Sequence, residues 1–487
     1  MTPDSSSFII ARDPFRAIRR GRQIFQRKFT RANGQGPLEM DGGDPTIPGS
    51  DPRGIHNTLI IGAGLSDSCA SCHGRPRGSA GAGGDVATRP DSRDAPHLFG
   101  LGLKEMLADE ITTDLRAIRT QALADARRLQ TTITRNLTSK GISYGQIIAR
   151  RDGTVDTSRV QGVNPDLRVR PFFLHGDTIS IREFLVGAFN AEMGLESFDP
   201  FLKAADGGAR VVTPAGMVLD GRLDNIEAPP ASSLTDDPDD DGKMNEIPES
   251  IVDFMEFYLL HYFKAARGET NADTGVGRDL VTRPTSQGGL GCATCHIPDL
   301  TINRDRRVAD VETRFDPVQG NPFNRLFATA TPLLVEQNDG SGYPTIKRPA
   351  GNPFTVRFIF TDFKRHDLGP NFHENNYDGT VRTQFLTTPL WGVADTAPYG
   401  HDGRSMNLRD VILRHGGEAQ AARDRFRGLS ATAQRQVIQF LDSLVLFPPD
   451  DTASNLDPGD RANARYPQVG HGSIRLTTIF NNPADPE

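Results

Sequence analysis

The chain is poor in the features that mark membrane, nucleic-acid-binding and disulfide-stabilised proteins. No segment of its 487 residues approaches the run of about 18 apolar residues that a transmembrane helix needs. A formal net charge of −7 argues against a basic surface for nucleic acid. The four cysteines are too few for a disulfide framework in a chain of this length. We therefore expect no membrane span and no nucleic-acid partner.

The cysteines that are present belong to two copies of one short motif, Cys-x-x-Cys-His. The residues of the two copies are Cys69, Cys72, His73, Cys292, Cys295 and His296. This is the attachment pattern of c-type haem, in which both thiols bind the porphyrin and the imidazole binds the iron. A redox-active disulfide or a zinc site would leave both histidines unexplained. The motifs therefore predict two covalently bound c-type haems.

The haem motifs also predict a location. Bacterial c-type haem is normally attached outside the cytoplasmic membrane, so we expect a periplasmic or otherwise exported protein. The longest N-terminal apolar run, 8–11, is too short for the core of a signal peptide. An exported protein conflicts with the lack of a recognisable signal peptide. We give more weight to the haem motifs and interpret the sequence as a processed or trimmed form, or one that begins at the wrong start codon.

The sequence also indicates a repeated organisation. Gly and Pro number 49 and 34, which favours long ordered loops between helices. Segments 21–25 and 277–281 are similar and each precedes a haem motif, which indicates a divergent internal repeat. We expect a mainly α fold of two cytochrome c-like haem domains with long loop insertions. The expected divisions are an N-terminal segment (1–52), haem domain 1 with insertions and an Asp-rich loop (53–270), haem domain 2 (271–449) and an extended C-terminal tail (450–487).

Apolar spacing locates the main helices. It predicts helices at 103–137, 179–193, 248–266, 408–415 and 430–446. Residues 150–178 are expected to be irregular or to form short strands, and 299–384 to be rich in loops.

An acidic loop precedes the third of these helices. Asp237, Asp239 and Asp241 alternate along the chain, followed by a glycine and then by Asn245. This spacing resembles a Ca²⁺-binding EF-hand loop, although its twelfth position is Pro248 instead of the bidentate acid. A solvated acidic turn is the alternative interpretation. We favour a calcium site.

Several segments together resemble one protein family. They are Thr388-Pro-Leu-Trp391-Gly, Ala397-Pro-Tyr-Gly-His401-Asp-Gly-Arg404, the stretch 408–419, the helix segment 187–194 and His366-Asp367-Leu-Gly369. In this order they resemble the di-haem oxidoreductases, which are related to bacterial di-haem cytochrome c peroxidases, from about residue 60 to 447. Relatives include a tryptophylquinone-maturing enzyme and rubber oxygenases, so the fold alone does not decide the chemistry.

The resemblance implies two imidazoles on haem 2. In the peroxidases the second ligand of this haem lies fourteen residues beyond the histidine of the His-Asp-Gly motif, and that count from His401 ends at His415. Haem 2 would be held by His296 and His415 and would store electrons at a low potential. A histidine stabilised by the helix dipole is the alternative for His415, and Met406 is a rival ligand.

Haem 1 would be held by His73 and would be the peroxide site. No histidine lies between His73 and His97, so we expect this iron to be five-coordinate or water-ligated, with His97 and His175 as the nearby candidates for closing it. Glu192 matches the family's distal glutamate, which moves a proton during O–O cleavage; a solvent-facing glutamate is the alternative. Phe184 replaces a glutamine of the peroxidases, which makes the pocket more apolar.

A calcium at the domain junction is also implied. The carbonyls of Thr396 and Pro398 and the carboxylate of Asp94 match the family's donors, and oxygen ligands suit this cation. His366 is expected to contact a haem propionate or to have a structural role. Trp391, the only tryptophan, fits a core aromatic better than an electron relay.

The function implied by the resemblance is a peroxidase or oxidase that reacts with H₂O₂. Haem 1 would be the reaction site and haem 2 the electron store. Electrons would come from a small redox protein or from an organic or protein donor. Two alternatives stay open: an O₂-using dioxygenase similar to the rubber oxygenases, and a di-haem cytochrome that only transfers electrons, which requires a six-coordinate haem 1.

Overall fold

A computed structural model describes most of the chain. The described residues are 5–36, 66–74, 94–239, 241–261, 270–308, 334–349, 351, 353–375 and 380–445, with short strands at 266–267, 311–315, 328–332 and 474–475. Most of the tail expected at 450–487, and the end of the N-terminal segment 1–52, lie outside these residues.

Helices and strands are mixed. Helix makes up 39% of the structure and strand 15%, in many small sheets. The expectation of a mainly α fold is therefore wrong. Most of these strands are only two to five residues long, too short for the alternation by which a strand is recognised in a sequence.

The helical elements alternate with short strands along the chain. They are α1 (Ser6–Arg12), α2 (Pro14–Gln26), η1 (Arg31–Asn33), α4 (Cys69–His73), α5 (Leu101–Leu129), α6 (Ile181–Met193), α7 (Pro200–Asp206), α8 (Glu249–His261), α9 (Ala272–Thr282), η2 (Thr285–Gln287), η3 (Cys292–Thr294), η5 (Val393–Asp395), α10 (Leu408–Arg414), η6 (Gly417–Ala419), α11 (Gln420–Arg427) and α12 (Ala431–Leu441).

All strand pairs are antiparallel. The strands are β1 (Ile133–Ser139), β2 (Ile142–Ala149), β3 (Val155–Asp156), β4 (Arg210–Val212), β5 (Val218–Asp220), β6 (Ala266–Arg267), β7 (Leu300–Ile302), β8 (Val311–Phe315), β9 (Ala328–Pro332), β10 (Leu334–Gln337), β11 (Ile346–Pro349), β12 (Phe354–Val356), β13 (Arg365–Asp367), β14 (Glu374–Asn375), β15 (Val381–Arg382), β16 (Gln384–Leu386), β17 (Leu444–Val445) and β18 (Ile474–Arg475). The sheets are β1-β2-β3, β18-β9-β8, β4-β5, β17-β6, β12-β7, β10-β11, β13-β16 and β14-β15.

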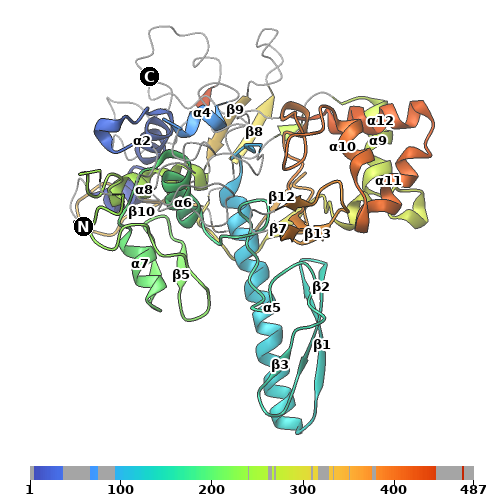
Figure 1. The fold of residues 1–487 in the computed structure, drawn as a ribbon, viewed down its shortest axis with the longest axis horizontal. Helices are drawn as coiled ribbons and strands as arrows, with labels where there is room; N and C mark the ends of the chain where they lie inside the picture. Colours follow the sequence, from blue (N-terminus) through green and yellow to red (C-terminus); the bar gives the residue numbers. More distant parts are fainter. Residues whose placement is uncertain are drawn as a thin grey trace.

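The long helix α5 differs most from its prediction. The helix expected at 103–137 ends at Leu129, where Gln130 adopts a left-handed conformation with φ 53°. Three β-branched residues follow from 131 to 133, which favour a strand over a helix, and β1 pairs with β2 from Ile133 opposite Ala149 onward. The end of α5 and β1–β3 together project from the body as an arm (Figure 1).

The two halves repeat one helix packing. Gly21 of α2 lies so close to α8 that a Cβ here would come within 2.3 Å of the Phe254 carbonyl oxygen. Gly277 of α9 lies against α12 in the same way, where a Cβ would come within 1.9 Å of the Gln436 carbonyl oxygen. The two similar sequence segments therefore occupy equivalent places, each on the helix before a haem motif.

A buried ion cluster fixes α6 against α8. The Arg182 guanidinium donates to Asp199, Asp253 and Glu256, each at 2.8 Å, and all four side chains are buried. A buried charge needs such partners, because an unpaired one would be strongly destabilising. This cluster sets the orientation of α6, which carries Glu192.

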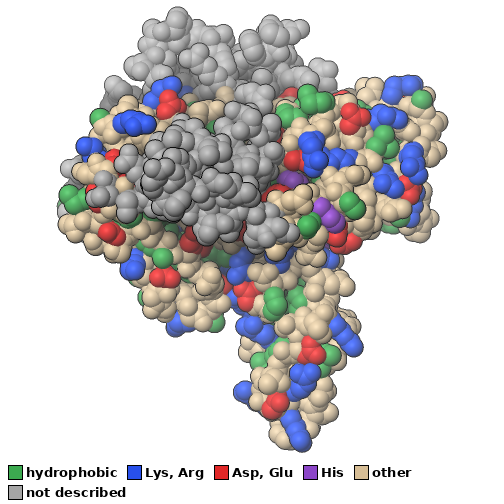
Figure 2. All heavy atoms as spheres, viewed as in Figure 1, with side chains coloured by type: hydrophobic (Ala, Val, Ile, Leu, Met, Phe, Trp, Pro, Cys, Tyr) green, Lys and Arg blue, Asp and Glu red, His purple; other side chains and the backbone are tan. Residues whose placement is uncertain are grey.

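The surface is mixed in charge. Lys and Arg side chains are spread along the arm and over the lobe of α9–α12, with Asp and Glu among them (Figure 2). Within the described residues, no helix combines the length and apolarity that crossing a bilayer requires.

Candidate haem sites

One large cavity joins the two Cys-x-x-Cys-His motifs. Its volume is about 1090 Å³, above the roughly 300–1,000 Å³ of a typical small-molecule site. Its walls include residues of α4, α6, α10 and η3, and thus of both halves. All four cysteines line it as free thiols, which argues against a disulfide. This space and these thiols fit two porphyrins.

His73 ends the short helix α4 and lines the cavity. Its Nδ1–H donates to the Pro96 carbonyl at 2.8 Å, so the lone pair lies on Nε2, the nitrogen that a metal would bind. Burial lowers the pKa of His73 to about 4, which keeps the imidazole in the neutral form that binds metal. These features fit the predicted ligand of haem 1.

His296 and His415 line the same cavity with the same arrangement. The Nδ1–H of His296 donates to the Phe360 carbonyl at 3.1 Å, and that of His415 to the Val411 carbonyl at 2.7 Å. Burial lowers the pKa of both imidazoles, that of His415 to about 4, and the proximity of His296 lowers the latter further. Two neutral imidazoles in reach of each other fit bis-histidine ligation of haem 2.

The alternatives for haem 2 fit less well. A histidine held by the helix dipole would have a raised pKa, whereas that of His415 is lowered. The side chain of Met406 is 72% exposed and is not part of the cavity wall. Its thioether therefore faces solvent.

The two other histidines predicted near haem 1 differ in whether a ring nitrogen is left without a hydrogen bond. The Nε2–H of His97 donates to the Trp391 carbonyl at 2.8 Å, and its Nδ1 accepts the N–H of Phe99 at 3.2 Å. His97 thus has no nitrogen left for iron. His175 is buried in the cavity wall, and its Nε2 has no hydrogen-bond partner among the described residues.

Glu192 lies on the last turn of α6, half-buried in the cavity wall. Its backbone carbonyl accepts the N–H of Ser66 at 3.0 Å, which ties α6 to the segment leading into α4. Phe173 and Phe184 line the same cavity with their ring centroids 5.2 Å apart. A carboxylate and an apolar wall therefore occur together, as predicted from Phe184.

The donors predicted for the junction calcium meet at one boundary. Asp94, Thr396 and Pro398 all line the cavity. The N–H of Asp94 donates to the His401 carbonyl at 3.0 Å, which holds Asp94 against the turn that contains the other two residues. A calcium at this place stays a prediction.

The Asp-rich loop is only partly as predicted. Asp237 and Asp239 lie together, but their third neighbour is Glu196. Asp241 is exposed, and its carboxylate accepts a backbone N–H of its own loop. The Asn245 side chain oxygen is buried without a hydrogen-bond partner among the described residues. Sequence reasoning missed Glu196, because it lies far outside the local spacing of the loop.

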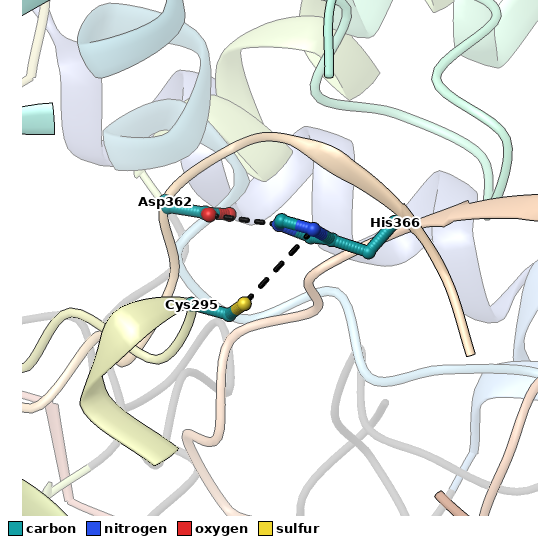
Figure 3. Close-up of side chains that lie close together, drawn as sticks. All are labelled: Cys295, Asp362 and His366. Carbon is teal, nitrogen blue, oxygen red and sulfur yellow. Dashed lines mark hydrogen bonds and ion pairs between the residues drawn. The ribbon is translucent and has the colours of Figure 1, made fainter. Parts of the chain in front are cut away.

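His366 lies beside the second haem motif. Its Nε2–H donates to Asp362 at 2.9 Å, and the Cys295 sulfur is 4.0 Å from Nδ1 (Figure 3). The Nδ1–H donates to Glu418 at 2.8 Å. Burial acts to lower the pKa of His366, but the hydrogen bonds and charges of Asp362 and Cys295 together outweigh it, and the pKa rises to about 11. These three side chains could hold a metal, but haem attachment would occupy the Cys295 thiol. Both N–H groups of His366 are in hydrogen bonds to carboxylates, which fits the structural role better than a contact with a haem propionate.

A comparison with protein families gives a match over residues 323–444, to the family described as "Di-haem oxidoreductase, putative peroxidase". A search of curated proteins found no match. The matched segment contains His366, Trp391, His401 and His415, while both Cys-x-x-Cys-His motifs precede it. Over residues 323–444 the chain is therefore similar to the di-haem oxidoreductases, and the two haem motifs that line one cavity agree with this similarity.

Proposed function

We propose that the protein is a peroxidase or oxidase that reacts with H₂O₂ at haem 1 and stores electrons at haem 2. The match of residues 323–444 to an oxidoreductase family is the coarser basis of this proposal. When bound, the haems supply redox-active iron, while the protein supplies binding, orientation and electrostatics. The residues of the cavity wall are therefore assigned by what each can do for a bound haem.

The main support for the proposal is that two imidazoles are available to haem 2 and fewer to haem 1. His296 and His415 both offer Nε2 and lie within electrostatic reach of each other. His73 offers Nε2 on the other motif, and both ring nitrogens of its neighbour His97 are already in hydrogen bonds. The other candidate, His175, contacts Arg382 through Nδ1, and its Nε2 lies 3.7 Å from the Glu374 carboxylate. Two axial imidazoles close an iron and suit electron storage, whereas one leaves a position for peroxide.

Glu192 is the residue we assign to proton transfer. Its carboxylate would take the proton from the near oxygen of peroxide and deliver it to the far oxygen. The aromatic side chains of Phe173 and Phe184 would keep water away from this exchange. This assignment rests on the position of Glu192 in the cavity wall with the first haem motif.

The electron donor and location are proposals as well. A small redox protein, or an organic or protein donor, would reduce haem 2, and the residues that would hold the two haems line one cavity. We propose a periplasmic or otherwise exported location, because that is where bacterial c-type haem is attached.

Electron paramagnetic resonance of the purified di-haem protein tests the proposal. The resting ferric protein should show one high-spin signal and one bis-histidine low-spin signal. Adding H₂O₂ should remove the high-spin signal within the mixing time. Two low-spin signals that ignore H₂O₂ would instead establish an electron-transferring cytochrome.

The aromatic wall supports one second candidate, an O₂-using dioxygenase for an apolar substrate. Phe173 is 41% exposed although it borders the cavity, so an apolar surface leads from solvent toward the first motif. Oxygen uptake with a short polyisoprene and no H₂O₂ would favour this candidate. Dependence of turnover on H₂O₂ would exclude it.

A further inference from the structure

We propose that Glu196 completes a Ca²⁺ site with Asp237, Asp239, Asn245 and Glu246 at the C-terminal end of α6. This site differs from the predicted EF-hand-like loop in its ligands, because it includes Glu196 and Glu246 and does not include Asp241. None of its residues lines the cavity, whereas the junction donors Asp94, Thr396 and Pro398 do, and the site does not depend on the haem chemistry.

The geometry points to a missing cation. Carboxylate oxygens of Glu196, Asp237 and Asp239 all lie within 4.8 Å of one another. Glu196 is 3% exposed and Asp239 is 4% exposed, so bulk water does not separate these charges. In the described part of the chain, no hydrogen bond reaches Oε2 of Glu196, Oδ1 of Asp237, Oδ1 of Asn245 or Oε1 of Glu246. Buried oxygens without partners are rare unless an ion or water satisfies them.

The negative charge of these side chains also calls for a bound cation. Burial, followed by the charges of Asp239, Glu246 and Asp237, raises the pKa of Glu196 to about 8. Burial and neighbouring acids also raise the pKa of Asp239 to about 6 and that of Glu246 to about 7. No Lys, Arg or His side chain in the described residues forms a salt bridge with this cluster. A divalent cation would remove the repulsion that these shifts express.

The donor set selects calcium. All five donors are oxygens, four of them carboxylate, which suits a hard cation and excludes a soft one. Gly242, at φ 85°, makes the sharp turn of the loop, and its N–H donates to Asp237 at 3.0 Å. Pro248 stands where an EF-hand has its bidentate acid. Glu196 supplies that acid from another segment.

The site would join two elements that carry the first haem pocket. The Glu196 N–H donates to Glu246 at 2.7 Å, and the Ile247 N–H donates to the Glu196 carbonyl at 3.0 Å. The acidic loop is thereby attached to the segment after α6, four residues beyond Glu192, just before α8 begins. A bound Ca²⁺ would hold the end of α6 in place.

Calcium content and binding of the full-length holoprotein test the proposal. The protein is stripped with a chelator and then titrated with CaCl₂ by calorimetry, with MgCl₂ as competitor. Glu196→Gln should lower the affinity of this site by roughly tenfold or more. Without Ca²⁺, Glu196→Gln should melt above the wild type, because one repelling charge is gone, and it should lose the rise in Tm that Ca²⁺ gives the wild type.

Two further variants make the result specific. Asp236→Asn changes the same charge in the same loop, but its carboxylate already accepts hydrogen bonds from Ser232, so its calcium binding should match the wild type. Asp94→Asn affects only the predicted junction site and should leave the response of the Glu196 site intact. The proposal is overturned if Glu196→Gln binds Ca²⁺ like the wild type, or if MgCl₂ at equal concentration displaces it.

Discussion

At the scale of single residues, three histidines share one arrangement. His73, His296 and His415 each donate Nδ1–H to a backbone carbonyl, and burial lowers the pKa of each. The carbonyl decides which nitrogen faces the cavity, so each ring is oriented before a metal arrives. Pro96, Phe360 and Val411 give these carbonyls, and no local sequence pattern marks them.

Replacing His415 tests the second ligand of haem 2. His415→Met should convert the bis-histidine low-spin signal to that of a His/Met pair and raise the haem 2 potential by on the order of 0.1 V. Redox titration followed by electron paramagnetic resonance measures both. Met406→Leu is the control, because its side chain is solvent-exposed. An unchanged haem 2 signal in His415→Met would show that another residue binds the iron.

Glu192 gives a second prediction at this scale. Glu192→Gln keeps the shape of the side chain but cannot move a proton, so the rate of reaction with H₂O₂ should fall roughly 10²- to 10⁴-fold. Stopped-flow loss of the high-spin absorption measures the rate. Resting spectra should not change, and Glu192→Asp should recover part of the rate. A rate within twofold of the wild type would remove Glu192 from the mechanism.

At the scale of elements, helices were predicted better than strands. The helices expected at 179–193 and 408–415 are confirmed as α6 and α10 to within two residues. Ser180 explains the start of α6, since its side chain accepts the N–H of Glu183, and Gly194 ends the helix with φ 62°. The strands of 299–384 were missed because each depends on a partner strand elsewhere in the chain, which local spacing does not show.

The repeated helix contact gives a prediction at the scale of elements. Gly277→Ala places a methyl group against the Gln436 carbonyl and should destabilise the protein by roughly 1–3 kcal/mol. A Cβ at Gly275, on the same helix, would have no neighbouring atom within 4 Å. Gly275→Ala should therefore stabilise the protein by roughly 0.5–1 kcal/mol. Thermal unfolding of both variants measures the difference. If the two substitutions act alike, close packing of α9 on α12 is refuted.

At the scale of the whole molecule, candidate haem ligands could be predicted from the sequence, whereas their surroundings could not. The Cys-x-x-Cys-His motifs and the spacing from His401 to His415 are local patterns, and the structure brings both to one cavity. Glu196 and Glu418 lie more than 40 residues from their partners in the sequence, and only folding brings them together. Sequence reasoning therefore predicted candidate haem ligands and missed these more distant groups.

One buried carboxylate connects the arm helix to the segment after the second haem motif. Glu110 of α5 accepts Lys140 Nζ at 2.6 Å and the backbone N–H groups of Asn303 at 3.0 Å and Asp305 at 2.8 Å. Burial acts to raise the pKa of Glu110, but these hydrogen bonds outweigh it and lower the pKa from 4.5 to about 2. The carboxylate form is therefore favoured by folding.

The lowered pKa of Glu110 predicts how stability depends on pH. Its contribution should be complete above about pH 4.5 and should disappear as the pH falls through about 2. Glu110→Gln should lower the free energy of unfolding by roughly 1–3 kcal/mol at pH 7, and this difference should shrink steadily below pH 4.5. Urea unfolding at several pH values measures it. Asp114→Asn, whose partner Arg304 is 56% exposed, should change stability by less than about 1 kcal/mol. A difference for Glu110→Gln that is constant from pH 7 to 2 would mean that its charge does not hold the two halves together.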